Sequence, residues 1–168
     1  MAATAATAAT ATRPTPQPVP QGYPRLSPYL CVDGAAAAIA YYSAVFGAET
    51  RMRLDAPDGS VAHAELAIGP SLVMLGDPFP GMGFQPPGSF GGTPVTLHLY
   101  VPDVDATVAR AVDAGARLVR PPGNQFYGDR SATICDPFGH VWSLATHVED
   151  VAPEEIQRRF AAMFATAQ

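Results

Sequence analysis

The feature that most constrains this fold is a pattern that occurs twice along the chain. In the clearer copy, Asp136-Pro137-Phe138-Gly139-His140 predicts a tight turn, and the alternating apolar residues of Val141–Ala145 predict a strand after it. The weaker copy turns at Gly69-Pro70 and then runs apolar over Leu72–Leu75. The repeat spacing is nearly constant: 69 residues separate Val32 from Val101, 68 separate Gly47 from Gly115, and 70 separate Gly69 from Gly139. Such agreement indicates a chain built from two related units.

Both units have the same predicted order, a strand, a helix and three further strands. The first has strands at 26–32, 49–54, 60–68 and 72–75 and a helix at 35–46, closed by Gly47. The second has strands at 94–101, 117–120, 131–135 and 140–147 and a helix at 104–114, closed by Gly115, with Pro121-Pro122-Gly123 as a break. Two tandem βαβββ modules predict an α+β fold whose curved sheets form a cleft, the usual place for a small ligand.

Three further segments flank or join these modules. Residues 1–22 are an Ala/Thr tract followed by a Pro/Gln tract, which predicts a disordered tail and a poor secretory signal. The modules, 23–76 and 93–150, form one expected domain over 23–150. Between them, residues 76–92 are rich in Gly, Pro and aromatic residues, so we expect a flap over a pocket, a connection between the halves, or both. Within 151–168, Pro153–Ala165 predicts an amphipathic C-terminal helix whose apolar face carries Ile156, Phe160, Met163 and Phe164.

Composition excludes several classes of function. Hydrophobic residues make up 48% of the chain, but no stretch approaches the roughly 18–20 uninterrupted apolar residues of a membrane span. The net charge of −5 and the lack of a basic cluster argue against nucleic acid as a partner. Cys31 and Cys135 are too few for a disulfide scaffold and fall in predicted strands, so we expect free, buried thiols and a cytoplasmic protein.

Three stretches resemble a known family. Leu97–Val101, Gly128-Asp129-Arg130 and Asp136–His147 are similar to the PhnB-like branch of the vicinal oxygen chelate superfamily, which includes glyoxalase I, the bleomycin-resistance proteins and the extradiol dioxygenases. The resemblance covers roughly residues 24–160. It implies two βαβββ modules, often paired as dimers, so that cups form from both halves of one chain or from two chains.

The resemblance also implies a metal site in the metal-dependent members. There, four inward side chains, usually His and Glu, hold one divalent ion, and the corresponding positions in this chain are Ser27, Glu65, Thr96 and Ser143. Only Glu65 is a strong ligand, because hydroxyl groups bind Zn, Ni or Fe weakly. We therefore expect no intact four-ligand metal site and no cofactor.

Strand alternation leaves a second arrangement open. His63 shares a face with Glu65, and His98 shares a face with Thr96. A triad of His63, Glu65 and His98 would have enough donors for Zn or Ni. Alternatively, Glu65 and His98 hydrogen-bond each other in a partly buried cleft and need no metal.

Aromatic residues supply the remaining candidates. Tyr100 shares the His98 face and can stack on a planar ligand, whereas Trp142 has the opposite parity to Ser143 and is expected beneath a helix. Phe126 and Tyr127 lie in a loop that either closes on a ligand or is simply anchored by an Asp129–Arg130 pair. The expected ligand-binding residues are His98, Tyr100, Glu65, His63, Phe126 and Tyr127.

Two functions are compatible with these residues. The sequence favours a protein that binds a small planar or apolar molecule without turnover. The alternative is a divalent-metal-dependent lyase or isomerase of the glyoxalase type that uses Glu65, as ligand or base, together with His98. In either case we expect a homodimer, because a βαβββ module leaves strand edges exposed that pairing would cover.

Overall fold

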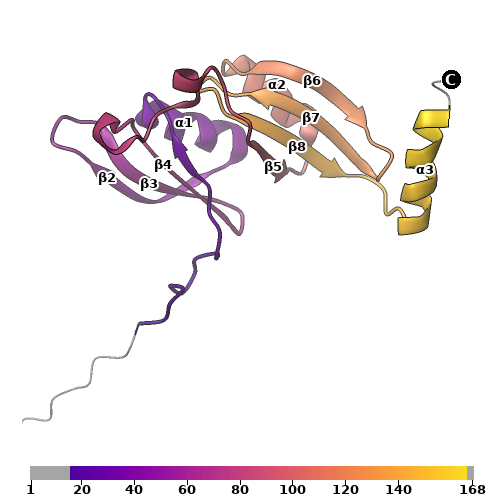
Figure 1. Ribbon diagram of the computed structural model, residues 1–168, viewed down its shortest axis with the longest axis horizontal. Helices are drawn as coiled ribbons and strands as arrows, with labels where there is room; N and C mark the ends of the chain where they lie inside the picture. The colour runs from indigo at the N-terminus through magenta and orange to yellow at the C-terminus, as the bar shows by residue number, and fades with distance from the viewer. Residues whose placement is uncertain (1–15, 166–168) are drawn as a thin grey trace, which may run out of the picture.

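The computed structural model describes residues 16–165, so residues 1–15 of the expected tail and residues 166–168 lie outside the described part. Two modules lie side by side, followed by a C-terminal helix (Figure 1). The first module contains β1 (Tyr29–Cys31), α1 (Ala35–Phe46), β2 (Glu49–Asp55), β3 (Val61–Ile68) and β4 (Ser71–Gly76). The second contains β5 (Thr96–Tyr100), α2 (Val104–Asp113), β6 (Arg117–Asn124), β7 (Asp129–Cys135) and β8 (Val141–His147), and α3 (Pro153–Ala165) ends the described chain.

The two four-stranded sheets have the same topology, which confirms the predicted repeat. Their strand orders are β1-β4-β3-β2 and β5-β8-β7-β6. In each, the first strand is parallel to the last and the other pairs are antiparallel. The registers match as well, because Tyr29 lies opposite Met74 in the first sheet and His98 lies opposite Ser143 in the second. The α+β architecture of two βαβββ modules is therefore the observed one.

Helix α1 has the bounds that the sequence predicts. Gly47 ends it in the left-handed conformation (φ 68°), where its N–H donates to the carbonyl of Ser43. At the other end, the carboxylate of Asp77 accepts hydrogen bonds from the N–H groups of Gly34 and Ala35. Its second oxygen accepts from the N–H of Val61 at 2.7 Å. Asp77, the first residue after β4, thus links the start of α1 to β3 through hydrogen bonds.

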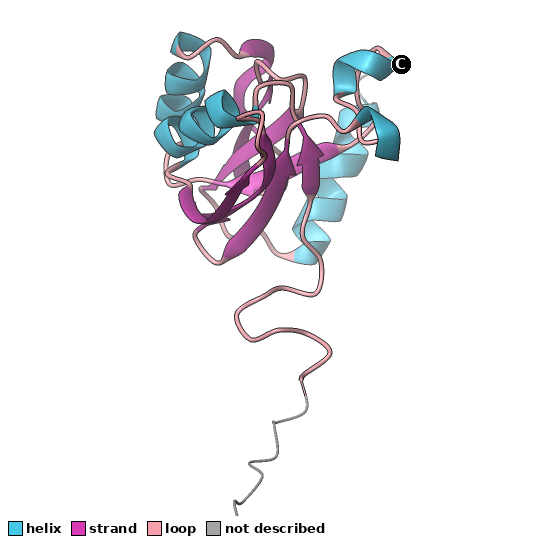
Figure 2. Cartoon of the chain, turned by 90° about the vertical axis from the view of Figure 1, so that its left-hand side faces the viewer, coloured by secondary structure: helices cyan, strands magenta, loops and turns pink. Residues whose placement is uncertain are grey.

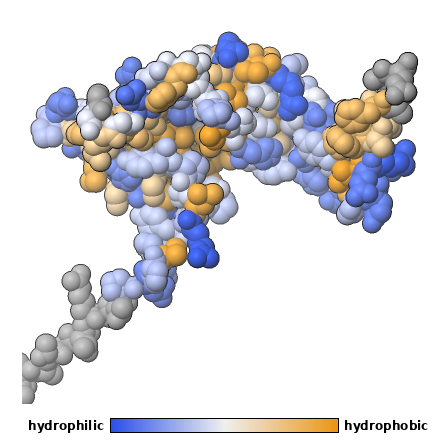
Figure 3. Space-filling model, viewed as in Figure 1, coloured by the Kyte–Doolittle hydropathy of each residue, from blue (hydrophilic) through white to orange (hydrophobic). Residues whose placement is uncertain are grey.

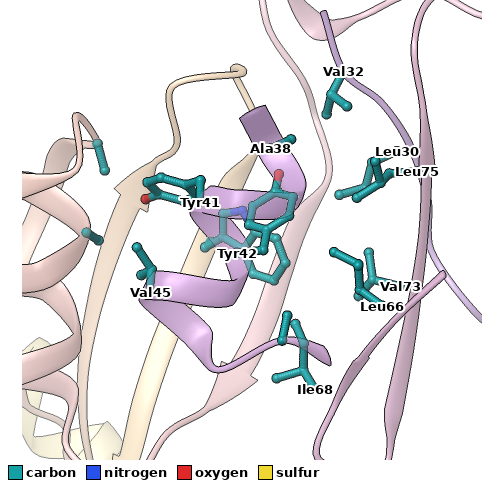
Figure 4. Packing of buried hydrophobic residues seen from close by; sticks show 14 of the residues in the cluster. Leu30, Val32, Ala38, Tyr41, Tyr42, Val45, Leu66, Ile68, Val73 and Leu75 are labelled. Atoms are coloured by element: carbon teal, nitrogen blue, oxygen red, sulfur yellow. The ribbon is translucent and has the colours of Figure 1, made fainter. Parts of the chain in front are cut away.

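The two modules share one core, and α1 lies at their junction (Figure 4). Tyr42 on α1 is 1% exposed, and its ring centroid lies 5.5 Å from that of Trp142 on β8. Phe46 packs on the same indole at 4.8 Å. The expectation that Trp142 lies beneath a helix is confirmed, although the helix belongs to the other module.

A buried carboxylate fastens this junction. Asp136, which opens the turn before β8, accepts hydrogen bonds from the Tyr42 hydroxyl at 2.7 Å and from Trp142 Nε1 at 2.9 Å. Its other oxygen accepts from the backbone N–H groups of Phe138 and His140. The Asp136–His140 turn is therefore both a strand connection and a clamp between the modules.

Two local predictions are wrong. Pro121-Pro122-Gly123 does not break the chain, because β6 continues through it to Asn124. The strand lies at the edge of its sheet and its register with β7 is irregular between Arg120 and Gly123, which is where prolines are tolerated in a strand. The predicted first strand is also too long, since only Tyr29–Cys31 pairs with β4.

Helix α3 stands at the far end of the second module (Figure 1). One of its sides is hydrophobic and the other hydrophilic (Figure 3). Phe160 packs on Phe126 with ring centroids 5.4 Å apart, and Arg159 forms an ion pair with Glu149 at 2.7 Å. Among residues 16–165, no helix is long and apolar enough to cross a membrane.

Candidate functional site

The face of the first sheet that points away from α1, here called the N-terminal open face, carries two of the expected site residues. Alternation along β3 puts His63 and Glu65 on it, and His63 Nε2 lies 3.4 Å from Glu65 Oε1. The other ring nitrogen, Nδ1, lies 2.9 Å from the hydroxyl of Tyr29 on β1. Glu65 is only 5% exposed. The predicted pairing of His63 and Glu65 on one face is confirmed.

A hollow of about 550 Å³ adjoins this face. Tyr29 forms one of its walls, and Phe79, Met82 and Phe84 of the segment between the modules form another. Phe84 also packs against Tyr29, with ring centroids 5.1 Å apart and the two ring planes tilted by 60°. Segment 76–92 therefore both connects the modules and covers a pocket, as its composition predicted.

The N-terminal segment also reaches this face. Residues 16–28 leave the first sheet as an extended loop (Figure 2), yet the hydroxyl of Tyr23 lies 3.1 and 2.9 Å from the two carboxylate oxygens of Glu65. This hydrogen bond, with some burial, raises the pKa of Tyr23, so the phenol stays protonated and donates at neutral pH. Sequence reasoning missed Tyr23, because it stands outside any predicted strand.

The corresponding face of the second sheet, the C-terminal open face, carries His98 and Tyr100. Their rings meet edge to face at 4.9 Å, which confirms that they share a face. His98 Nδ1 lies 3.2 Å from the hydroxyl of Ser143 on β8. Both His98 and Tyr100 are solvent-exposed, so this face is open in the single chain.

Beside these residues, Asp129 lies at the centre of a second hydrogen-bonded network. Its buried carboxylate accepts a hydrogen bond from the Tyr100 hydroxyl at 2.9 Å, which raises the Tyr100 pKa, and its other oxygen lies 2.8 Å from His147 Nδ1. His147 Nε2 lies 3.0 Å from Asp150. Hydrogen bonds to Asp150 and then Asp129 raise the pKa of His147.

The predicted Asp129–Arg130 pair is wrong. Neighbouring residues of a strand point to opposite faces, so the two side chains of β7 cannot meet. Arg130 instead forms an ion pair with Asp105 on α2 at 2.6 Å. Phe126 and Tyr127 contact each other at 5.1 Å, and Phe126 packs against α3, so the loop is anchored by the C-terminal helix.

One chain does not bring the two open faces together. The described hydrogen-bond partners of Glu65 are Tyr23 and His63, whereas that of His98 is Ser143. Within residues 16–165, no group of three His, Cys, Asp or Glu side chains is arranged to hold a metal ion. The triad of His63, Glu65 and His98 is thus split between two sheets.

The sheet register also shows how poorly the residues fit a four-ligand metal site. Ser143 lies on β8, the last strand of its module, but Glu65 lies on β3. The residue that corresponds to Ser143 in the first sheet is therefore Met74 on β4, and not Glu65 as the sequence predicted, since Met74 pairs with Tyr29 as Ser143 pairs with His98. A thioether and a hydroxyl in these places are poor ligands for Zn or Ni, so the donor set does not fit the family's metal.

Comparison with known proteins agrees with this architecture. Residues 25–144 match the model of the Glyoxalase/Bleomycin resistance protein/Dioxygenase superfamily. An uncharacterized protein of Mycobacterium tuberculosis is 48% identical over 137 residues, which cover 80% of this chain and 81% of that protein.

Solved structures show the same fold. A protein of Arabidopsis thaliana is 26% identical with a TM-score of 0.58, and the match covers 73% of this chain and 98% of that one. A PhnB protein from Bacillus cereus is 16% identical with a TM-score of 0.58, covering 73% and 99%. The resemblance to this superfamily, with a PhnB protein among the structural neighbours, is therefore confirmed.

Proposed function

This chain belongs to the Glyoxalase/Bleomycin resistance protein/Dioxygenase superfamily, and we propose that it binds a small planar or apolar molecule on its N-terminal open face without an intact metal site. The observation that carries this proposal is the hollow of about 550 Å³ walled by Tyr29, Phe79, Met82 and Phe84. Aromatic and thioether side chains around a concave space favour a flat, apolar ligand. The polar side chains in its lining are Asp58, Ser60 and Asp77. His63, which contacts the Tyr29 hydroxyl, and Glu65 do not line the hollow but lie next to it on the same face.

We further propose that a second chain completes the cup. In the single chain, apolar side chains of both sheets remain exposed, among them Met52 (42%), Leu54 (55%) and Tyr100 (59%). Exposed apolar surface on an open sheet favours pairing with another copy. In such a homodimer, the C-terminal open face of one chain would contribute His98 and Tyr100 to the ligand held by the other. A cytoplasmic location is part of the same proposal.

The test of binding is a titration with naphthalene, a flat apolar probe, followed by intrinsic fluorescence. We expect saturable binding that weakens about tenfold in Phe84→Ala, because the probe loses an aromatic wall. Phe90→Ala is the matched control, since Phe90 lies in the same segment but does not line this hollow. Absence of binding, or equal weakening in both variants, would contradict the proposal.

The alternative remains a metal-dependent lyase or isomerase of the glyoxalase type. The shielded carboxylate of Glu65, 3.4 Å from His63, favours it, because such a group can serve as a base or ligand. It requires His98 to join Glu65 from a second chain. Turnover of a thiohemiacetal substrate that depends on added Zn or Ni, and is lost in Glu65→Ala, would establish this alternative.

A further inference from the structure

We propose that residues 20–23, here called the strap, fill a subsite for a phenolic hydroxyl, and that a ligand displaces Tyr23 from Glu65 by offering its own phenol. This inference rests on the proposed function and names the chemical class of the ligand. Because Tyr23 occupies this subsite in the free chain, the strap competes with the ligand for Glu65.

The conformation of the strap positions the Tyr23 hydroxyl against the Glu65 carboxylate. The N–H of Tyr23 donates to the carbonyl of Pro20 at 3.1 Å, which closes a four-residue turn. Gly22 is the third residue of that turn and has φ 81°, as a type II turn requires. Arg51 on β2 then holds the turn from outside, because its Nη1 donates to the Gly22 carbonyl at 3.1 Å and its guanidinium lies 5.3 Å from the centre of the Tyr23 ring.

The geometry at Glu65 defines what the subsite accepts. Both carboxylate oxygens lie within 3.1 Å of the single Tyr23 hydroxyl, so a lone donor on a flat ring satisfies the site. Glu65 is 5% exposed, and its one other described partner, His63, is more distant at 3.4 Å. An anionic ligand would be repelled here, and a ligand without a donor would leave the shielded carboxylate poorly satisfied.

Few contacts hold the strap on the first sheet, so Tyr23 can move away from Glu65. In the described part of the chain, the backbone of residues 24–27 makes no hydrogen bond to the sheet. The contacts of Arg51 with Gly22 and Tyr23 lie at the exposed surface of β2, where such contacts are weak. Tyr29, by comparison, is fixed by strand pairing with β4. A ligand phenol can therefore replace Tyr23 without unfolding any strand.

The subsite and the hollow belong to one face. Tyr29 walls the hollow, its hydroxyl contacts His63 Nδ1, and His63 Nε2 faces Glu65. A flat ring system that carries a hydroxyl could thus use the aromatic wall and the carboxylate together. This arrangement predicts that phenols bind better than the same rings without a hydroxyl.

The experiment compares 2-naphthol with naphthalene on the full chain. We expect Tyr23→Phe to bind 2-naphthol about tenfold more tightly, because the competing hydroxyl is gone, and Glu65→Gln to bind it about tenfold more weakly. Naphthalene affinity should stay within about twofold in both variants, since it has no donor for Glu65. Tyr41→Phe, which removes a phenol from the core, is the control and should change neither affinity. Arg51→Ala frees the strap without touching Glu65 and should also tighten 2-naphthol.

Each outcome decides between the proposals. Unchanged 2-naphthol affinity in both Tyr23→Phe and Arg51→Ala would contradict the proposal that the strap competes with the ligand. Equal affinity for the two probes, unaffected by Glu65→Gln, would overturn the phenol subsite while the proposed function stands. If neither probe binds to any variant that retains the wild-type melting temperature, the proposed function fails and this inference fails with it.

Discussion

Replacement of Tyr42 by Phe should loosen the junction between the modules. The Tyr42 hydroxyl donates to Asp136 at 2.7 Å in a fully buried site. Burial raises the pKa of Tyr42 and the charge of Asp136 raises it further, so the phenol remains a donor at any ordinary pH. A hydrogen bond to a charged group contributes about 1.5–3 kcal/mol. Because Trp142 Nε1 still donates to the same oxygen, we expect the lower half of that range.

The assay is thermal and urea unfolding of the full chain. A loss of about 1.5–2 kcal/mol corresponds to a decrease of roughly 3–8 °C in Tm for a protein of this length. Tyr41→Phe is the matched control, because Tyr41 is also buried but its hydroxyl has no hydrogen-bond partner among the described residues. It should be neutral or slightly stabilising. Equal effects of the two substitutions, or no effect of Tyr42→Phe, would show that the Tyr42–Asp136 hydrogen bond does not stabilise the junction between the modules.

Three further predictions concern assembly, the tail and pH. Light scattering after size exclusion should give twice the chain mass of 17.5 kDa, because pairing covers the exposed sheet edges, and a monomer at micromolar concentration would contradict this. Removal of residues 1–22 should change Tm by only about one or two degrees, since few apolar side chains anchor them, whereas a large decrease would make the tail part of the fold. The contacts of His147 raise its pKa above 6.5, so the stability they contribute is complete below that pH and is lost as the pH rises through the folded-state value. His147→Gln should therefore lose stability relative to wild type at acidic but not at alkaline pH. A loss at alkaline pH alone would show that folding does not raise the pKa of His147.

Local signals in the sequence predicted most of the secondary structure. The bounds of α1 follow from apolar spacing and from Gly47, which can adopt the left-handed conformation that ends the helix. The bounds of α3 follow from Pro153 and the amphipathic pattern after it. Even the burial of Trp142 follows from strand parity. In these cases the physical cause lies within a few residues of the effect.

Predictions failed where the cause lies elsewhere in the fold. Pro121-Pro122-Gly123 resembles a break, but an edge strand needs hydrogen bonds on one side only and accommodates it. The Asp129–Arg130 pair was predicted for a loop, but β7 begins at Asp129, so strand alternation separates the two side chains.

The candidate site was predictable only in part. Strand parity placed His63 with Glu65 and Tyr100 with His98, and both pairs are observed. Whether the two pairs meet depends on how the modules, and a second chain, are arranged, and no local pattern contains that information. Tyr23 reaches Glu65 through a turn outside any strand, so alternation could not reveal it.

The metal content of the purified protein tests the central claim most directly. If the chain binds its ligand without a metal site, elemental analysis should find far less than one Zn, Ni or Fe per chain. Added Zn or Ni should then shift Tm only slightly, since a metal that binds the folded state would raise it by mass action. Close to one metal per chain, lost in both Glu65→Ala and His98→Ala, would contradict the account and favour the enzyme.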